Sequence, residues 1–213
     1  KLSGISTGLI DLDGKMGGLN NSDLIILAGR PSMGKTSLAT NIAFNIAKAY
    51  RHGTRPDGSE GAIEGGVVGF YSLEMSAEQL AARILSEAAE VPSEAIRRGD
   101  MTEEEFRRFV NAAHDLSNCP LYIDDTPALP INQLAARARK LKRTMGLDLL
   151  IVDYLQLLKA ASAKDSRVNE VSEITQGLKA VAKELNIPVI ALSQLSRQVE
   201  QRDDKRPQLS DLR

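Results

Sequence analysis

The stretch LIILAGRPSMGKTSLA, Leu24 to Ala39, joins an apolar run to the segment GRPSMGKT, Gly29 to Thr36. This segment matches the pattern G-x-x-x-x-G-K-[ST] at every fixed position, and the pattern marks a phosphate-binding loop when it lies between a strand and a helix. Both neighbours are predicted here. The preceding run has strand length, and apolar residues recur at helical spacing after the loop: Leu38, Ile42 and Ile46.

The chemistry expected of this loop is the binding of a nucleoside triphosphate. Backbone N–H groups of a small-residue turn can surround phosphate oxygens, and the helix N-terminus adds partial positive charge. Lys35 would place its ammonium at the β and γ phosphates, and the Thr36 hydroxyl would ligate Mg²⁺. The predicted nucleotide contacts are Arg30, Pro31, Ser32, Met33, Gly34, Lys35, Thr36 and Ser37. The alternative is a glycine-rich turn that matches the pattern by chance.

Five short apolar runs predict the strands of one sheet. They cover Leu24 to Ala28, Val67 to Ser72, Leu121 to Asp124, Leu149 to Asp153 and Val189 to Ser193. The runs are continuous rather than alternating, which is typical of strands buried on both faces. Since helical patterns separate them, we expect an α/β fold with a mainly parallel, twisted sheet and helices on both faces.

Three signals place helices between these strands. Ser76 with Gln79, and Thr102 with Glu105, have the spacing of capping boxes, so helices should begin just after each pair's first residue. A third helix is predicted from a stripe at helical period: Val171, Ile174, Leu178, Val181 and Leu185. The segment from Arg51 to Gly66 contains five glycines and one proline, and it is expected to be an inserted surface loop.

Two carboxylates are predicted to complete the site. Asp153 ends an apolar strand and would hold Mg²⁺ opposite Thr36, because ligands of open parallel sheets bind at the carboxyl ends of the strands. Glu74 follows the second strand directly and is the candidate to orient or deprotonate the attacking water. Each has a plainer interpretation: an aspartate that merely ends a strand, or a surface glutamate favoured by the dipole of the next helix.

Other polar residues also end predicted strands. Gln194 follows Val189 to Ser193 and could sense the γ phosphate through its amide, although it could equally form a local turn. Asp124 and Asp125 resemble paired carboxylates, but Thr126 and Pro127 follow them, and this composition favours a turn.

Composition narrows the class of protein. The chain has 213 residues, net charge −1 and pI near 6.2, so it lacks the overall basic excess that would indicate nucleic-acid binding by itself. One cysteine, Cys119, excludes an internal disulfide, and no apolar run reaches membrane-spanning length. We expect a single domain over residues 1–213, outside membranes and inside the cell. The chain begins without methionine, and we expect it to be part of a longer protein.

At this point the residues resemble a known family. Thr7, Gly8, Leu12 and Asp13 are followed by DLIILAGRPSMGKTSLA, YSLEMS, LLIVDYLQLL, ALSQLSR and DKRPQLSDLR. Together these segments are similar to the successive motifs of the RecA-like C-terminal ATPase domain of DnaB-type replicative DNA helicases. YSLEMS and the terminal segments are more specific than the phosphate loop, which many ATPases share.

The resemblance implies a homo-hexameric ring that encloses single-stranded DNA and hydrolyses Mg²⁺-ATP between subunits to move 5′ to 3′ and unwind duplex at the replication fork. It implies a primase and a helicase loader as partners, and a bacterial cytoplasmic, nucleoid-associated location. Within the site it makes Glu74 the catalytic base, Asp153 the magnesium carboxylate and Gln194 the phosphate sensor. Lys35, the cation expected at the β and γ phosphates, is predicted to be catalytic together with Glu74 and Gln194. It also implies that the chain ends before the arginine finger and the last strands.

Loops after the fourth and fifth strands would face the DNA. The first runs from Lys159 to Asn169 and includes Lys164 and Arg167, and the second carries Arg202 and the predicted DNA-binding residues Arg197, Lys205, Arg206 and Arg213. No aromatic residue occurs in either loop, so contacts to phosphates, sensitive to salt, are expected rather than base stacking. Acidic residues are mixed with these basic residues, so a solvated charged surface is the alternative.

A second basic cluster, Arg137 to Arg143, is interpreted as the solvated face of a helix. The reason is an apolar stripe that accounts for the pattern of this helix: Leu134, Ala138, Leu141 and Met145.

Two other functions fit part of the sequence. A recombinase or regulatory ATPase of the RecA-like class would share the phosphate loop and sheet, and directional unwinding would distinguish it from a helicase. A nucleotide-binding scaffold without catalysis would be distinguished by single-turnover hydrolysis, and the presence of Lys35, Thr36, Glu74 and Asp153 argues against it.

Overall fold

The computed structural model describes residues 1–30, 34–160 and 166–195. Its elements, in chain order, are α1 (Ile10–Met16), β1 (Leu24–Gly29), α2 (Lys35–Lys48), β2 (Arg51–Thr54), β3 (Glu60–Glu64), β4 (Val68–Ser72), α3 (Ala77–Ala89), α4 (Ser93–Arg98), α5 (Glu103–Asn118), β5 (Leu121–Asp124), α6 (Ile131–Met145), β6 (Leu149–Asp153), the 3₁₀ turn η1 (Leu155–Leu157), α7 (Arg167–Leu185) and β7 (Val189–Gln194).

The five predicted strands form one sheet, in the order β1-β7-β6-β4-β5, and every neighbouring pair is parallel. Each strand agrees with its predicted range to within one residue. The last strand in the chain, β7, lies between β1 and β6. This order separates the phosphate loop from Asp153 by one strand and places the end of β7 between them.

Alternate residues of the central strands enter two cores, which confirms helices on both faces of the sheet. Leu150 and Val152 of β6 pack with α6 and α7, whereas Leu149 and Ile151 pack with α2 and α3. Because all of β6 is buried, both faces need apolar side chains, and this explains the continuous apolar run. No helix in the described ranges is long and apolar enough to cross a membrane.

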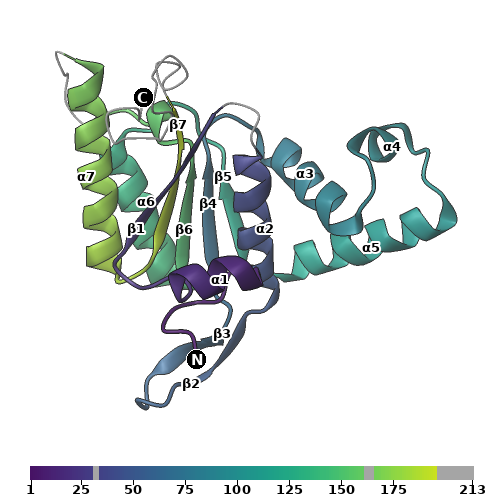
Figure 1. The fold of residues 1–213 in the computed structure, drawn as a ribbon, viewed down its shortest axis with the longest axis horizontal. Helices are drawn as coiled ribbons and strands as arrows, with labels where there is room; N and C mark the ends of the chain where they lie inside the picture. The colour runs from purple at the N-terminus through teal and green to yellow at the C-terminus, as the bar shows by residue number, and fades with distance from the viewer. Residues whose placement is uncertain (31–33, 161–165, 196–213) are drawn as a thin grey trace.

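Both capping boxes are formed as predicted. The side chain of Ser76 accepts from the N–H of Gln79, and that of Thr102 accepts from Glu105, with the reciprocal bonds also present. Helix α7 begins at Arg167, four residues before the predicted stripe, because Ser166 caps it. Helices α3, α4 and α5 extend away from the sheet as an arm (Figure 1).

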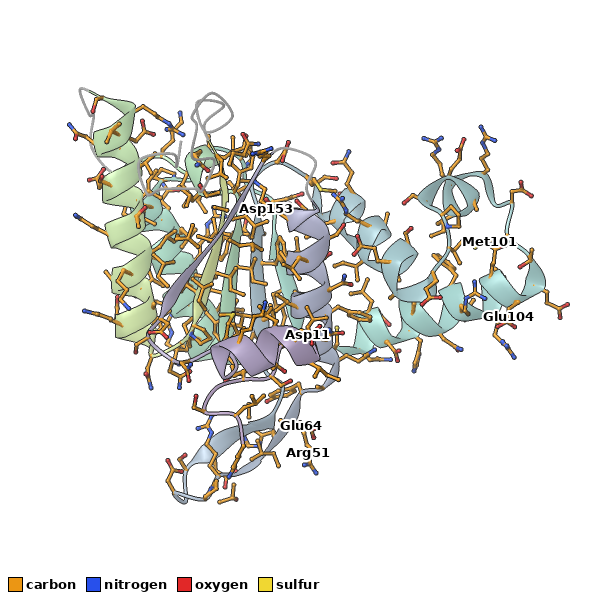
Figure 2. The ribbon with its side chains drawn as sticks, viewed as in Figure 1. Asp11, Arg51, Glu64, Met101, Glu104 and Asp153 are labelled. Carbon is orange, nitrogen blue, oxygen red and sulfur yellow. The ribbon has the colours of Figure 1, made fainter. Side chains whose placement is uncertain are left out.

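The prediction of a loop from Arg51 to Gly66 was wrong. The segment forms an antiparallel hairpin, β2 with β3, which projects from the end of the molecule opposite Asp153 (Figures 1 and 2). Its turn contains Asp57-Gly58, with Gly58 at φ 86°, and an Arg51–Glu64 ion pair of 3.4 Å joins the strands. The Asp-Gly pair was the hairpin signal. The high glycine content obscured it.

Candidate nucleotide site

The described start of α2, at Gly34, is suited to binding an anion. Gly34 is the N-cap of α2 at φ 73°, a left-handed conformation that glycine adopts without steric cost. This described part of the helix start has neither a side-chain cap nor an acidic residue in its first turn. A phosphate can accept from the N–H groups at such a helix start. Pro31, Ser32 and Met33 lie outside the described residues.

Lys35 reaches across the sheet edge from the start of α2. Its aliphatic stem passes over Gly29, where an added Cβ would lie 3.2 Å from Cδ of Lys35. Its Nζ donates to the carbonyl of Ser193 at 2.7 Å. Burial lowers the pKa of Lys35, while the Asp153 and Glu74 carboxylates act to raise it. The ammonium thus lies in the field of both predicted carboxylates.

Thr36 and Asp153 come into direct contact. The Thr36 hydroxyl donates to Oδ2 of Asp153 at 3.2 Å, and Asp153 is only 3% exposed. Burial raises the pKa of Asp153, and Glu74 raises it further, against the opposing effects of Thr36, Lys35 and Arg83. A carboxylate whose charged form is disfavoured in this way would be stabilised by additional positive charge.

The Thr36 hydroxyl and the Asp153 carboxylate fit Mg²⁺ better than a metal ion that is held entirely by protein side chains. A hydroxyl and a carboxylate are hard oxygen ligands, and Mg²⁺ is usually held by one or two protein oxygens together with phosphates and water. Across the described residues, no group of three or more His, Cys, Asp or Glu side chains could hold a metal ion. Thr36 and Asp153 are therefore suited to a Mg²⁺ ion that arrives with the nucleotide.

Glu74 lies at the same edge of the sheet. The N–H of Leu73 donates to the carbonyl of Asp153 at 2.9 Å, which ties the segment after β4 to the end of β6. The Glu74 side chain is exposed, and it acts electrostatically on Lys35, Asp153 and Tyr154. A carboxylate that is open to solvent beside a buried cation site can contact a water molecule there.

Gln194 ends β7 between the phosphate loop and Asp153. Its backbone pairs with Gly29 of β1, and the N–H of Leu195 donates to the carbonyl of Gly29 at 3.2 Å. Gln194 is half-buried and belongs to a strand, so the alternative of a local turn does not apply. The sheet order thus brings Lys35, Thr36, Glu74, Asp153 and Gln194 to one edge.

Two residues at this edge were missed from sequence. Arg83 of α3 lies 3.4 Å from the Ser37 hydroxyl and pairs with Glu87 at 3.5 Å. Gln156 of η1 is 8% exposed and contacts the end of β7. Two signals were available in the sequence. Arg83 lies three residues after Leu80 and therefore on the same side of the helix, and Gln156 is a polar residue within the apolar run LLIVDYLQLL.

The remaining candidates lie elsewhere. Asp124 accepts from the N–H of Thr126, as expected of a turn former, and also from Arg137 at 2.7 Å. The interpretation of the Arg137 to Arg143 cluster as a purely solvated face was therefore incomplete, since Arg137 is ion-paired and Lys142 donates to the carbonyl of Leu185. The predicted DNA-binding residues lie outside the described residues: Arg197, Lys205, Arg206 and Arg213.

Comparison with known proteins identifies relatives over the whole chain. The family model of the DnaB-like helicase C-terminal domain matches residues 4–213. The chain is 58% identical over 210 residues to the replicative DNA helicase DnaB of Rickettsia prowazekii (strain Madrid E), which covers 99% of this chain and 42% of that protein. It is 46% identical over 213 residues to the replicative DNA helicase DnaC of Bacillus subtilis (strain 168). This match covers 100% of this chain and 44% of that protein.

Two solved structures have the same fold. One is described as an ATPase domain, superposes with a TM-score of 0.85 at 37% identity, and covers 100% of this chain and 71% of that one. A DnaB-like replicative helicase, described with its interactions with primase, also gives a TM-score of 0.85 at 37% identity. This match covers 100% of this chain and 48% of that one. The chain spans less than half the length of the curated relatives it matches.

Proposed function

Because this chain belongs to the family of DnaB-like helicase C-terminal domains, we propose that it is the motor of a hexameric replicative DNA helicase. It would hydrolyse ATP between subunits, move along single-stranded DNA and separate duplex at the replication fork. The observation that carries this proposal is the convergence of Lys35, Thr36, Glu74 and Asp153 at one sheet edge. A scaffold that only binds Mg²⁺-nucleotide could use Asp153, but it has no need of the second carboxylate, Glu74.

Binding of ATP would begin at the N-terminus of α2. Residues Arg30 to Ser37 would surround the phosphates, and the open N–H groups of the helix would donate to the phosphate oxygens. Lys35 has three donors, so it can hold the carbonyl of Ser193 and still present N–H groups to the β and γ phosphates. This arrangement would fix the nucleotide against β7.

Thr36 and Asp153 would hold Mg²⁺, which when bound neutralises charge on the β and γ phosphate oxygens. Asp153 is suited to this role because its carboxylate is buried and already hydrogen-bonded by Thr36. The raised pKa of Asp153 means that a cation would relieve an unfavourable charge. Cation binding and folding of this edge would therefore favour each other.

Hydrolysis would depend on Glu74 and Gln194. The exposed carboxylate of Glu74 would orient the attacking water and accept its proton, while Lys35 would stabilise charge on the γ phosphate. Gln194 would contact the γ phosphate with its amide and move when that phosphate leaves. Both residues lie next to β6, the strand that ends at Asp153. Glu74 follows Leu73, whose N–H donates to the Asp153 carbonyl, and Gln194 ends β7, the neighbour of β6.

The partners follow from the same family. We propose contact with single-stranded DNA through Arg197, Lys205, Arg206 and Arg213, assembly as a homo-hexamer, and association with a primase and a helicase loader in the bacterial cytoplasm near the nucleoid. A solved relative at 37% identity is described with its interactions with primase, which supports the primase proposal.

A forked duplex with a 5′ single-stranded tail tests the proposal. The protein at its natural length should unwind this substrate with ATP and Mg²⁺, and Glu74→Gln should abolish unwinding while ATP still binds. Glu78→Gln is the matched control, because Glu78 is another exposed glutamate only four residues away, in the first turn of α3. ATP hydrolysis without strand separation at any salt concentration would instead favour a recombinase or regulatory ATPase.

A further inference from the structure

Gln156 is a buried polar residue outside the predicted nucleotide contacts. It lies in the 3₁₀ turn η1, three residues after Asp153, and is 8% exposed. A buried amide destabilises the fold unless its donors and acceptor are paired. The partners of this amide therefore show what the residue does.

The Gln156 side chain bonds to the end of β7. Its Nε2 donates to Oγ of Ser193 at 2.8 Å and to the carbonyl of Gln194 at 3.2 Å, and its Oε1 accepts from the N–H of Gln194 at 3.4 Å. One side chain thus pairs with both backbone polar groups of Gln194. The Gln156 amide thus makes the backbone hydrogen bonds that a neighbouring strand normally makes.

The sheet explains why a side chain is needed here. The pairing of β6 with β7 ends at Val152 and Ala191, whereas β7 continues alongside β1 as far as Gln194. Beyond Ala191, the described part of β6 therefore supplies no ladder partner to the Gln194 backbone, and the Gln156 amide takes that place. The orientation of Gln194 consequently depends on where η1 lies.

The backbone of Gln156 makes a second connection. Its carbonyl accepts a hydrogen bond from Nη2 of Arg167, the first residue of α7, which also pairs with Glu170 at 2.9 Å. Arg167 belongs to the first loop expected to face DNA, and its side chain is 47% exposed. Gln156 therefore contacts both the candidate γ-phosphate sensor and a cation of the candidate DNA surface.

We infer that Gln156 is a positioning residue that couples Gln194 to Arg167, so that the nucleotide state and the DNA contact influence each other. The DNA half of this inference rests on the proposed motor function. The physical basis is a short chain of hydrogen bonds in which the Gln156 side chain holds the Gln194 backbone and its carbonyl holds Arg167. Coupling of this kind is reciprocal, so it can be measured from either end.

The first experiment measures nucleotide discrimination without DNA, on the protein at its natural length. The ratio of the Kd for ADP to the Kd for ATPγS is obtained by displacement of a fluorescent ADP. Gln156→Met keeps the side-chain length but removes the amide, and it should change this ratio by about fivefold or more, the lower end of typical couplings. Ser193→Ala, which removes one acceptor of the amide, should shift it in the same direction by less.

Two controls separate positioning from general damage. Gln176→Met places the same change on an exposed site of α7 and should leave the ratio unchanged. If Gln156 acts through Gln194, the Gln156→Met, Gln194→Ala double variant should discriminate no worse than Gln194→Ala alone. Additive effects of the two changes, or an unchanged ratio in folded Gln156→Met and Ser193→Ala variants, would overturn the inference.

The second experiment measures the other end. The Kd for an oligo-dT strand is compared in ADP and in ATPγS, and the ratio should collapse towards one in both Gln156→Met and Arg167→Gln. Glu170→Gln, which removes the ion pair of Arg167, should keep the ratio of the parent. If the DNA affinity of the parent protein is the same in ADP and in ATPγS, the motor function and the coupling of Gln156 to Arg167 are both overturned. The coupling of Gln156 to Gln194 is still decided by the ratio of nucleotide affinities measured without DNA.

Discussion

Thr36 and Asp153 lie 117 residues apart in the chain, yet the Thr36 hydroxyl donates a hydrogen bond to Oδ2 of Asp153 at 3.2 Å. The contact spans β7, because the strand order places β7 between the strands that precede the two residues. The phosphate loop and the candidate magnesium carboxylate therefore meet only when three strands are in register.

Asp153→Asn should stabilise the nucleotide-free protein while abolishing Mg²⁺-dependent hydrolysis. The folded-state pKa of Asp153 is raised, so its ionised form at neutral pH opposes folding, and a neutral amide removes that cost. We expect the Tm to rise by roughly 2–4 °C for each kcal/mol gained. Thermal unfolding measures the stabilisation, and the variant should also lose the Tm increase that Mg²⁺-ATP gives the parent. Phosphate release from ATP measures the loss of hydrolysis.

Asp125→Asn is the control for that change. Asp125 is an exposed aspartate that follows β5 at the same end of the sheet, and it accepts from the N–H of Ala77 at the start of α3. Its variant should show no gain in Tm and should keep its response to Mg²⁺-ATP. A Tm for Asp153→Asn below that of the parent would contradict the assignment of Asp153 as a destabilising charge.

Asp13→Asn should destabilise the fold in a pH-dependent way. Burial raises the pKa of Asp13, but hydrogen bonds from Ser6 and Thr7 outweigh it and the pKa is lowered. The stability from ionised Asp13 is thus full above the unfolded pKa, about 3.9, and is lost as pH falls through the lower folded value. Denaturant unfolding should show a loss of about 1–3 kcal/mol at pH 7, and the gap between parent and variant should narrow below about pH 4.

Gly65→Ala should be far more damaging than Gly58→Ala. Both glycines have positive φ, 57° and 86°, so each substitution carries about 1–2 kcal/mol of backbone strain. A Cβ on Gly58 meets nothing within 4 Å, whereas one on Gly65 would lie 2.3 Å from the carbonyl oxygen of Ile46. We expect more than about 4 kcal/mol of destabilisation at Gly65, measured by chemical denaturation. Equal losses at the two sites would show that the hairpin base can shift freely.

Cys119 should react slowly with alkylating reagents in the native protein. Burial raises the pKa of its thiol, and Sγ donates to the carbonyl of Leu116 at 3.4 Å, so the reactive thiolate is disfavoured. Iodoacetamide labelling at about pH 8, followed by mass spectrometry of the Cys119 peptide, should be slower than in urea. Equal rates would place the thiol in open solvent.

Local signals were sufficient for much of the fold. The apolar runs predicted all five sheet strands, and the Ser76 and Thr102 boxes predicted two helix starts, because hydrophobic patterning and capping depend on neighbours in sequence. The stripe that ends at Met145 was wrong at that residue, which is 54% exposed. Short elements without a strong period were missed, namely α1, α4 and the β2–β3 hairpin.

The residues expected to form a nucleotide site can be identified from sequence alone, since Gly34, Lys35, Thr36, Glu74 and Asp153 each stand next to an apolar run or a helix start. How these residues combine depends on the tertiary structure. The position of β7 between β1 and β6 brings Ser193 to Lys35 and places the end of β7 within hydrogen-bonding distance of the Gln156 amide. Strand order depends on contacts between residues far apart in the chain, and a pattern confined to one segment does not contain that information.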